Sequence, residues 1–314
     1  MSRNADAPDP TGAAVATMKR REQRDWRDGL ARAWRSMLRA KWPLFAVAVL
    51  LTLVTLAIIG PDIAPKDPNR QNILARLQPP MVADASGSVE FVLGTDGLGR
   101  DLLSRLIYGA RISLLVGLTA VLIGGTLGTT LGMVAGYFGG RVDDVIMRLA
   151  DIQLAFPFIL LAIMFLVVLG QGVWNLILIL GIGQWVTYAR IARGQTISQR
   201  EKEFVEAARA LGASTASILL RAILPNILAP LIVIASFNIA SVILAEAALS
   251  FLGLGVPPTV PTWGGMLAES RDQIIAGRWW LSVFPGVAIM LVVLSFNILG
   301  DWLRDLLDPR LRGA

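Results

Sequence analysis

The segment Glu203–Pro225 is the one long polar interruption in the apolar second half of the chain. Its apolar residues recur at i, i+3/i+4 and i+7 and predict a short helix with one apolar face: Phe204, Ala207, Ala208 and Leu211. Gly212 is expected to end this helix, and a second helical run, Thr215–Ile223, is expected to end before Pro225. Such a hairpin is suited to binding another protein, because an apolar ridge on a short helix fits a groove in a partner.

Covalent and metal chemistry is limited by residue types that the chain lacks. The sequence contains no Cys and no His, which excludes disulfides, thiol nucleophiles, Ser-His-Asp catalysis and the usual zinc sites. No G-x-x-x-x-G-K-[ST] motif occurs, so the chain cannot hold ATP by that route. We therefore predict no catalytic residue, no metal ligand and no cofactor in this chain, and any energy must come from a partner.

The composition is that of a polytopic membrane protein, since 54% of the residues are hydrophobic and 17% are charged. The net charge of +6 is then not a signal for nucleic acid. We expect an all-α fold with six membrane spans, the third kinked at Pro157. The expected spans are Pro43–Ile59, Ile112–Val134, Leu149–Leu169, Val173–Ile191, Ile227–Leu249 and Leu281–Leu299.

The organisation expected around these spans has four parts. Residues 1–42 form a basic cytoplasmic tail, in which Met18–Trp42 is either an interfacial helix or a plain basic flank. Residues 43–111 hold the first span and an outer loop, 112–302 hold the core with the cytoplasmic loop 194–226, and 303–314 form a second cytoplasmic tail. Within the core, Gly139–Arg148 is expected to be a polar connection, and Ser250–Trp280 a re-entrant or interfacial segment over the outer mouth.

The distribution of basic residues predicts the orientation. With both termini inside, 21 of the 29 Lys and Arg residues lie in the inner segments and 8 in the outer ones. Cytoplasmic loops collect Lys and Arg, so both termini and the Glu203–Pro225 segment are predicted to be cytoplasmic. Interface anchors are expected at the ends of the last span, at Trp279, Trp280 and Trp302.

The outer loop ends in the string Leu93-Gly-Thr-Asp-Gly-Leu-Gly-Arg-Asp-Leu-Leu-Ser-Arg105. Gly97 and Gly99 permit a tight turn. Asp101 and Arg105 stand at i, i+4 with the acid first, the favoured order for a helical ion pair. From the residues alone, this region is a surface helix with modest ion pairing.

Two further features lie inside the expected spans. Four glycines recur at every fourth position of the second span, Gly124, Gly128, Gly132 and Gly136, and small residues on one stripe let helix backbones approach closely in lipid. We interpret the stripe as tight packing, with a sliding contact as the alternative. Asn238 and Glu246 are candidates to line a pathway. Glu246 could meet a cationic substrate group or, near the outer end, a partner such as Arg271 or water.

Four strings together resemble the permeases of ABC importers of the dipeptide, oligopeptide and nickel type, over roughly Leu44 to Arg312. They are Glu206-Ala207-Ala208 with Gly212 and Leu224-Pro225, the L-G-T-D-x-x-G-R-D string, A-L-S-F-L-G-L-G followed by Pro and Trp263-Gly, and Asp308-Pro-Arg-Leu-Arg312. The chain departs from the pattern at Ala222, where the family has Ile. It also departs at Glu90-Phe91-Val92, where many members carry a His.

The resemblance implies a bacterial inner-membrane permease with a type I importer fold. It implies a heterodimer with a related permease, two cytoplasmic ATPases that carry ATP and Mg²⁺, and an external binding protein. Residues 203–225 would be the coupling loop, with Glu206 at the polar rim of the ATPase, Ala207 and Ala208 allowing close docking, and Gly212 setting the turn. Candidates for an outer gate or for contact with the binding protein are Asp96, Arg100, Asp101, Arg105 and Trp263.

Two other classes of protein compete with this interpretation. A secondary transporter needs ionisable residues at mid-membrane and inverted repeats, and a membrane hydrolase needs an activated nucleophile. No convincing mid-span charge and no paired carboxylates within a span are found in the sequence. The cargo stays open between peptides, which we favour, and nickel chelates, because the lack of His and Cys disfavours direct coordination of a soft metal.

Overall fold

The structure is a computed structural model that describes residues 41–83 and 88–307. The described chain is nearly all helical, and its contacts divide it into two units at Phe45/Ala46, within the first described helix. The elements are α2 (Trp42–Ile63), η1 (Ile73–Ala75), α3 (Leu102–Phe138), α4 (Gly140–Leu154), α5 (Phe158–Leu169), α6 (Val173–Arg200), α7 (Glu203–Ala210), α8 (Thr215–Ser217), η2 (Ile218–Ile223), α9 (Leu224–Phe251), α10 (Trp263–Ser270), η3 (Arg271–Gln273) and α11 (Trp280–Leu307). The expected helix Met18–Trp42 and the string Asp308–Arg312 fall largely or wholly outside the described residues.

Five of the described helices are long and apolar enough to cross a membrane. They are α2, α3, α6, the continuous helix Thr215–Phe251 that contains α9, and α11. Each contains one of the predicted spans, so these five predictions are confirmed. Two of the helices extend well beyond the span, since α3 has 37 residues where about 20 cross a bilayer.

The third predicted span bends at Pro157 as expected, but its first arm is longer than predicted, because α4 begins at Gly140 rather than at Leu149. It breaks into α4 and α5, which are bent by 86° and together make up a possible sixth span. Proline cannot donate a backbone hydrogen bond, and its ring clashes with the preceding turn. The side chain of Gln153 also holds the end of α4 on α6, since Nε2 donates to the Gly183 carbonyl at 3.0 Å and Oε1 accepts from Trp185 Nε1 at 2.6 Å. The expected polar connection Gly139–Arg148 is likewise mostly helical, as the start of α4.

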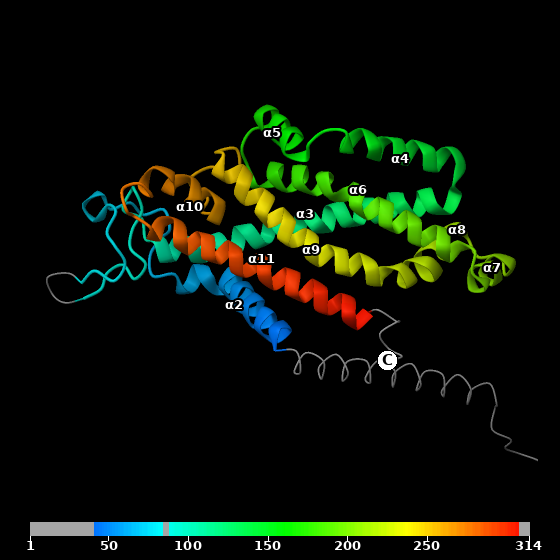
Figure 1. Cartoon of the computed structure of the whole chain (residues 1–314), viewed down its shortest axis with the longest axis horizontal. Coiled ribbons are helices and arrows are strands. Elements are labelled where there is room, and N and C mark those ends of the chain that lie inside the picture. Colours follow the sequence, from blue (N-terminus) through cyan, green and yellow to red (C-terminus); the bar gives the residue numbers. More distant parts are fainter. Residues whose placement is uncertain (1–40, 84–87, 308–314) are drawn as a thin grey trace, which may run out of the picture. The chain divides into compact units, whose positions relative to one another are not determined.

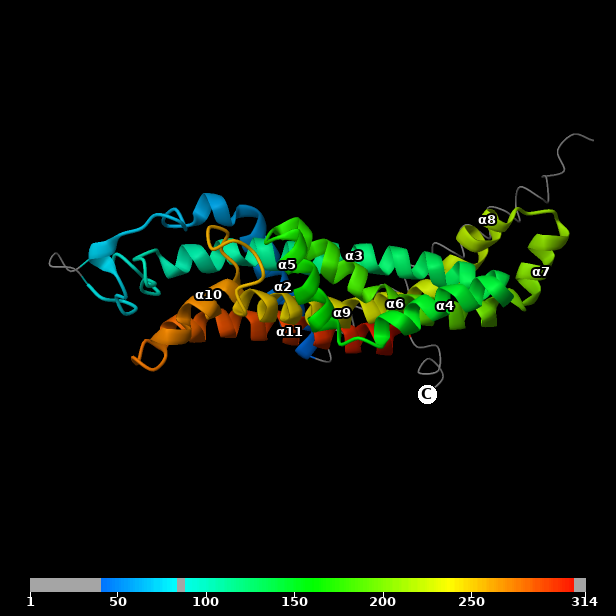
Figure 2. The same ribbon diagram turned by 90° about the horizontal axis from the view of Figure 1, so that it is seen from above.

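Of the three apolar clusters among the described residues of unit Ala46–Ala314, the two larger ones share α3 and α9. One cluster joins α3 to α5, α6, η2 and α9, and the other joins α3 to α9, α10 and α11. Figure 1 shows α3 beside α6, and α9 beside α11. Figures 1 and 2 agree that α7 lies at one end of these helices, while α10 and residues 64–83 and 88–101 lie at the opposite end. The fold thus separates the two groups of candidate residues along the helix axes.

The closest helix contact is between α3 and α6, and it follows the glycine stripe. A Cβ atom added to Gly124, Gly128, Gly132 or Gly136 would lie within 3.0 Å of a backbone carbonyl oxygen of α6. Those carbonyls belong to Gly181, Trp185, Ala189 and Arg193, which also recur every fourth residue. The stripe therefore faces α6 along its whole length, and no side chain larger than hydrogen fits there without moving a backbone.

We call the contact between the glycine stripe of α3 and the carbonyls of α6 the glycine seam. It predicts that alanine destabilises the protein at some positions of α3 and not at others. Gly128→Ala places a methyl group against the Trp185 carbonyl, and we expect it to destabilise the protein by about 1–3 kcal/mol through overpacking. Gly125→Ala is the matched control on the same helix, since its Cβ would lie 3.5 Å from the Tyr188 ring, an ordinary contact. Unfolding in detergent would measure both variants, and equal stability of the two would contradict the seam.

Candidate functional site

The helix α7 presents the apolar face that the sequence predicts. The side chain of Phe204 is 40% exposed and that of Leu211, directly after the helix, is 89% exposed, while Ala207 is exposed beside them. Val205 is fully buried and belongs to the α3–α6–α9 cluster, with Ala208 packed against that cluster. The sequence pattern does not single out Val205, because this residue lies off the apolar ridge. It anchors the helix and leaves the ridge free.

Gly212 has the conformation that a helix stop requires. Its φ is +76°, a left-handed value that glycine adopts without strain. Its N–H donates to the Arg209 carbonyl and that of Ala213 to the Ala208 carbonyl, each at 3.0 Å, which satisfies carbonyls at the end of α7. No heavy atom lies within 4 Å of a Cβ built on Gly212. A side chain at this position thus meets backbone strain but no steric block.

The second half of the loop differs from the sequence prediction. The run Thr215–Ile223 does not end before Pro225 but continues through α8 and η2 into α9, as one helix over Thr215–Phe251. η2 is π-helical, and the Leu224 N–H donates to the carbonyl of Leu219, five residues earlier. This wider turn accommodates Pro225, which lacks an N–H and would clash with the carbonyl four residues before it. The coupling-loop candidates are therefore joined rigidly to a membrane helix.

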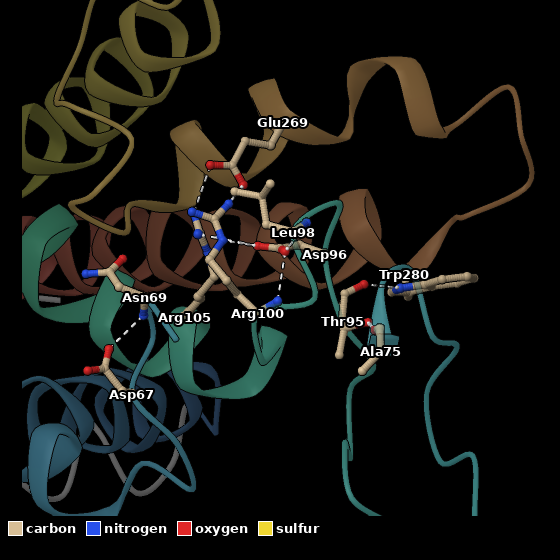
Figure 3. A network of polar contacts seen from close by, with 10 residues as sticks. All are labelled: Asp67, Asn69, Ala75, Thr95, Asp96, Leu98, Arg100, Arg105, Glu269 and Trp280. Atoms are coloured by element: carbon tan, nitrogen blue, oxygen red, sulfur yellow. Dashed lines mark hydrogen bonds and ion pairs between the residues drawn. The ribbon is translucent and has the colours of Figure 1, made fainter. Parts of the chain in front are cut away.

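The outer candidates form a buried ion network at the opposite end (Figure 3). Asp96 accepts from Arg100 Nε at 2.6 Å and lies 3.4 Å from Arg105 Nη1. Glu269 of α10 accepts from Arg100 Nη2 at 2.6 Å and from Arg105 Nη2 at 3.0 Å. The side chains of Arg100, Asp96 and Arg105 are at most 6% exposed, whereas that of Glu269 is 32% exposed. Sequence analysis missed Glu269, since nothing near position 269 links it to a motif 160 residues earlier.

The predicted ion pair between Asp101 and Arg105 is wrong, and so is the surface location. Asp101 is 3% exposed and caps the N-terminus of α3, where it accepts from the N–H of Ser104 at 2.8 Å and from its hydroxyl at 2.6 Å. An N-cap carboxylate satisfies free N–H groups of the first turn, and this leaves Arg105 to Asp96 and Glu269. The string Leu93–Arg105 therefore supplies two separate features, the N-cap of α3 and the ion network.

Two tryptophans fix α10 and α11 rather than anchoring the chain at a lipid interface. Trp263 is 1% exposed, its Nε1 donates to the Leu106 carbonyl at 3.1 Å, and its ring lies against Gly109 of α3. Trp280, an expected interface anchor, is 6% exposed and donates to the Thr95 carbonyl at 3.4 Å. That expectation is wrong for Trp280, because a polar partner inside the protein satisfies its N–H. The segment after Ser250 is thereby held on α3.

Glu246 is fully buried and has no cationic partner among the described residues. Its carboxyl group accepts from Ser250 Oγ at 2.8 Å and from Ser113 Oγ at 3.3 Å, and it faces the Thr262 hydroxyl. The expected partner Arg271 instead donates to the Phe251 carbonyl and lies over its ring. Glu246 thus joins α9, α3 and the start of α10. Asn238, the other pathway candidate, is half-buried.

The ion network predicts a strong effect of neutralising Glu269. Glu269→Gln leaves two buried guanidinium groups with Asp96 as their one carboxylate, and we expect a loss of about 1.5–3 kcal/mol, the range for hydrogen bonds to charged groups. Glu90→Gln is the matched control, because the Lys66–Glu90 pair is half-exposed and such pairs contribute at most about 1 kcal/mol. Thermal unfolding in detergent checks both variants. A Glu269→Gln protein as stable as Glu90→Gln would contradict this account.

Comparison with known proteins connects both ends of the molecule to one family. A family model described as "Binding-protein-dependent transport system inner membrane component" matches residues 128–313, which is more than half of the chain. A second, the N-terminal transmembrane domain of oligopeptide transport permease C, matches residues 30–80.

Curated relatives match almost the whole chain. The di/tripeptide transport system permease protein DppC of Pseudomonas aeruginosa is 44% identical, over 90% of this chain and 92% of that protein. The dipeptide permease DppC of Bacillus subtilis is 39% identical, over 89% and 85%. The glutathione transport system permease protein GsiD of Pectobacterium atrosepticum is 41% identical, over 89% and 90%.

A solved structure supports the fold independently. A chain of the inward-facing MetNI methionine ABC transporter aligns with a TM-score of 0.52 and 19% identity, over 65% of this chain and 97% of that one. At this identity, the likeness concerns the fold alone. The family models and the curated relatives identify the chain as a multi-pass member of the inner-membrane components of binding-protein-dependent transport systems, a permease subunit of an ABC importer.

Proposed function

We propose that this chain forms half of a translocation pathway for di- or oligopeptides, driven by ATP hydrolysis on partner subunits. A related permease supplies the other half, two cytoplasmic ATPases bind ATP and Mg²⁺, and an external binding protein delivers the cargo. The chain itself binds no cofactor in this scheme. The observation that carries the proposal is α7, a short helix anchored by buried Val205 that exposes Phe204, Ala207 and Leu211 as a ridge.

The proposed mechanism is mechanical. An ATPase bound to the α7 ridge would move α7. This helix follows α6 and is connected, through the turn at Gly212, to the continuous helix that contains α8 and α9. Because α6 is locked on α3 at the glycine seam, movement of α7 shifts packed helices rather than bending a loop. A packed interface switches between discrete arrangements. This is how closure of the ATPases would alternate access to the pathway.

Gly212 provides a test with an internal control. Gly212→Val forces a β-branched residue to φ near +76°, a strained conformation, and we expect loss of transport and of ATPase docking while the protein still inserts in the membrane. Gly212→Asn is the control, because Asn tolerates left-handed backbone and the site is open. The same reasoning makes Gly212→Asp a milder variant than Val. ATPase co-purification and uptake of a labelled dipeptide in proteoliposomes measure both; full activity of Gly212→Val would refute the role of the loop.

The ridge itself provides a second, independent prediction. Leu211→Ser removes an 89% exposed aliphatic side chain and should leave stability unchanged, yet weaken ATPase docking by about tenfold, as for a contact residue that contributes about 1–2 kcal/mol. Ala210→Ser is the matched control, since Ala210 is exposed on the same helix but off the ridge. Titration of the purified ATPase onto the permease would measure the two affinities. Equal affinities would show that docking uses another surface.

The cargo requires its own experiment. Relatives named for di/tripeptides, dipeptides and glutathione match at 39–44% identity, so overall identity does not separate these substrates. Uptake by the reconstituted system should be measured with a dipeptide, a tripeptide, glutathione and a nickel chelate. We expect the dipeptide or tripeptide to be taken up fastest, with strict dependence on ATP. Uptake by the chain alone without ATP would instead indicate a secondary transporter.

A further inference from the structure

Two outer loops of the chain, far apart in sequence, share a pattern. One reads Arg-Gln-Asn-Ile-Leu-Ala-Arg over 70–76, and the other reads Arg-Asp-Gln-Ile-Ile-Ala-Gly-Arg over 271–278. Each places two adjacent aliphatic residues between two arginines, and each contains a 3₁₀ turn, η1 or η3. We refer to Ile73 with Leu74, and Ile274 with Ile275, as the two aliphatic pairs.

Both pairs are exposed to an unusual degree. The exposed fractions are 79% for Ile73, 98% for Leu74, 54% for Ile274 and 95% for Ile275. Leu74 and Ile275 are the most exposed large apolar side chains among the described residues. Both loops lie in segments expected outside the membrane, at the end of the helices opposite to α7 (Figures 1 and 2). Such exposed apolar residues outside a span mark a contact surface.

The first loop and Trp280, two residues after the second loop, are hydrogen-bonded to the same buried residue, Thr95. The Thr95 hydroxyl donates to the Ala75 carbonyl at the end of η1, and its own carbonyl accepts from Trp280 Nε1 at 3.4 Å (Figure 3). Thr95 is 0% exposed and directly precedes Asp96 of the ion network. Thr95 therefore holds the first loop directly and the second loop through the start of α11. The second loop is closed on itself by the Arg278 N–H, which donates to the Gln273 carbonyl at 3.1 Å.

The charges beside the pairs indicate what they contact. Arg70 and Arg76 are exposed, and no ion pair to either occurs among the described residues. Arg271 and Asp272 are exposed beside the second pair, with Arg271 held over the Phe251 ring, so that the two loops together carry four arginines and one carboxylate. Apolar side chains rimmed by arginine have the composition of a protein–protein contact. A complementary partner carries an apolar patch rimmed by carboxylates.

We propose that the two aliphatic pairs and their arginines form one composite surface that docks the external binding protein. This inference rests on the proposed function, since a binding protein is a partner only of such an importer. The support through Thr95 places the surface directly beside the Asp96–Arg100–Arg105–Glu269 network, and thus at the start of α3. Docking at these loops would therefore act on α3, the helix that packs against α6 at the glycine seam.

The test uses the absence of cysteine from the sequence. Leu74→Cys and Ile275→Cys each give this chain a single site for a polarity-sensitive fluorophore, attached before the chain is assembled with its partners into the complete transporter in nanodiscs. Addition of the purified binding protein that supports uptake by this transporter should shift the emission to the blue at both sites, with one common Kd. Val82→Cys is the matched control, 44% exposed in the same outer loop but outside both pairs, and should not respond. Silent labels at 74 and 275 would overturn the proposal.

A second measurement determines the affinity for the binding protein without any label. Leu74→Ser and Ile275→Ser should each raise the Kd for the binding protein by about tenfold, and Arg76→Glu should raise it further at low salt than at high salt. Val82→Ser should leave the Kd unchanged, and basal ATPase activity should be unaffected in all four variants. Wild-type affinity in both serine variants would contradict the surface.

Two controls separate the other outcomes. If brominated lipids quench the labels at 74 and 275 in the absence of the binding protein, the pairs insert into the membrane and the proposal fails. If the ATPase co-purifies and uptake proceeds while the labels and the serine variants show no effect, this surface is wrong but the proposed function stands. If no ATPase associates at all, the proposed function itself fails.

Discussion

The close approach of α3 and α6 is the constraint on which the rest of the structure depends. Four glycines bring the backbone of α3 against the carbonyl oxygens of α6 over Gly124–Gly136. In lipid there is no hydrophobic drive between helices, so close packing of small residues supplies the association. Polar contacts then continue the seam beyond the glycines, since Arg193 of α6 pairs bidentately with Asp143 of α4, and Arg200 Nη1 donates to the Gly136 carbonyl at 2.9 Å.

This seam connects the two ends of the molecule. α3 starts at the cap formed by Asp101, beside the buried ion network, and two residues separate the end of α6 from the start of α7. The α3–α6 pair therefore has the ion network at one end and the exposed helix α7 at the other. Under the function proposed above, this pair would transmit movement between an ATPase at α7 and the pathway.

The outer end combines two ways of burying polar groups. The guanidinium groups of Arg100 and Arg105 are matched by two carboxylates, as burial of charge requires. Glu246 is instead surrounded by neutral hydroxyls. Both devices fasten the segment after α9 onto α3, one at Thr262 and the other at Glu269. This segment is consequently part of the packed core rather than a free outer loop, and it positions the loops that project beyond it.

Features that depend on local pattern could be predicted from the order of the amino acids. Apolar runs placed five spans, because each must satisfy its backbone within one helix, and the i, i+3/i+4, i+7 ridge with Gly212 predicted α7 and its stop. The motif strings identified the family. Whether the loop docks an ATPase, and which residues line the pathway, stay predictions from sequence and structure alike.

Features that depend on partners distant in the chain could be read from the folded molecule alone. Asp101 and Arg105 have favourable spacing for a local pair, yet Arg105 pairs with Glu269, 164 residues away, because capping α3 occupies Asp101. Trp280 lies inside rather than at an interface because the Thr95 carbonyl accepts its N–H. Pro157 bends the third span as its local chemistry predicts, whereas the attachment of the end of α4 to α6 depends on Gln153. For Arg105 and Trp280, a contact across the fold outweighed a local preference worth less free energy.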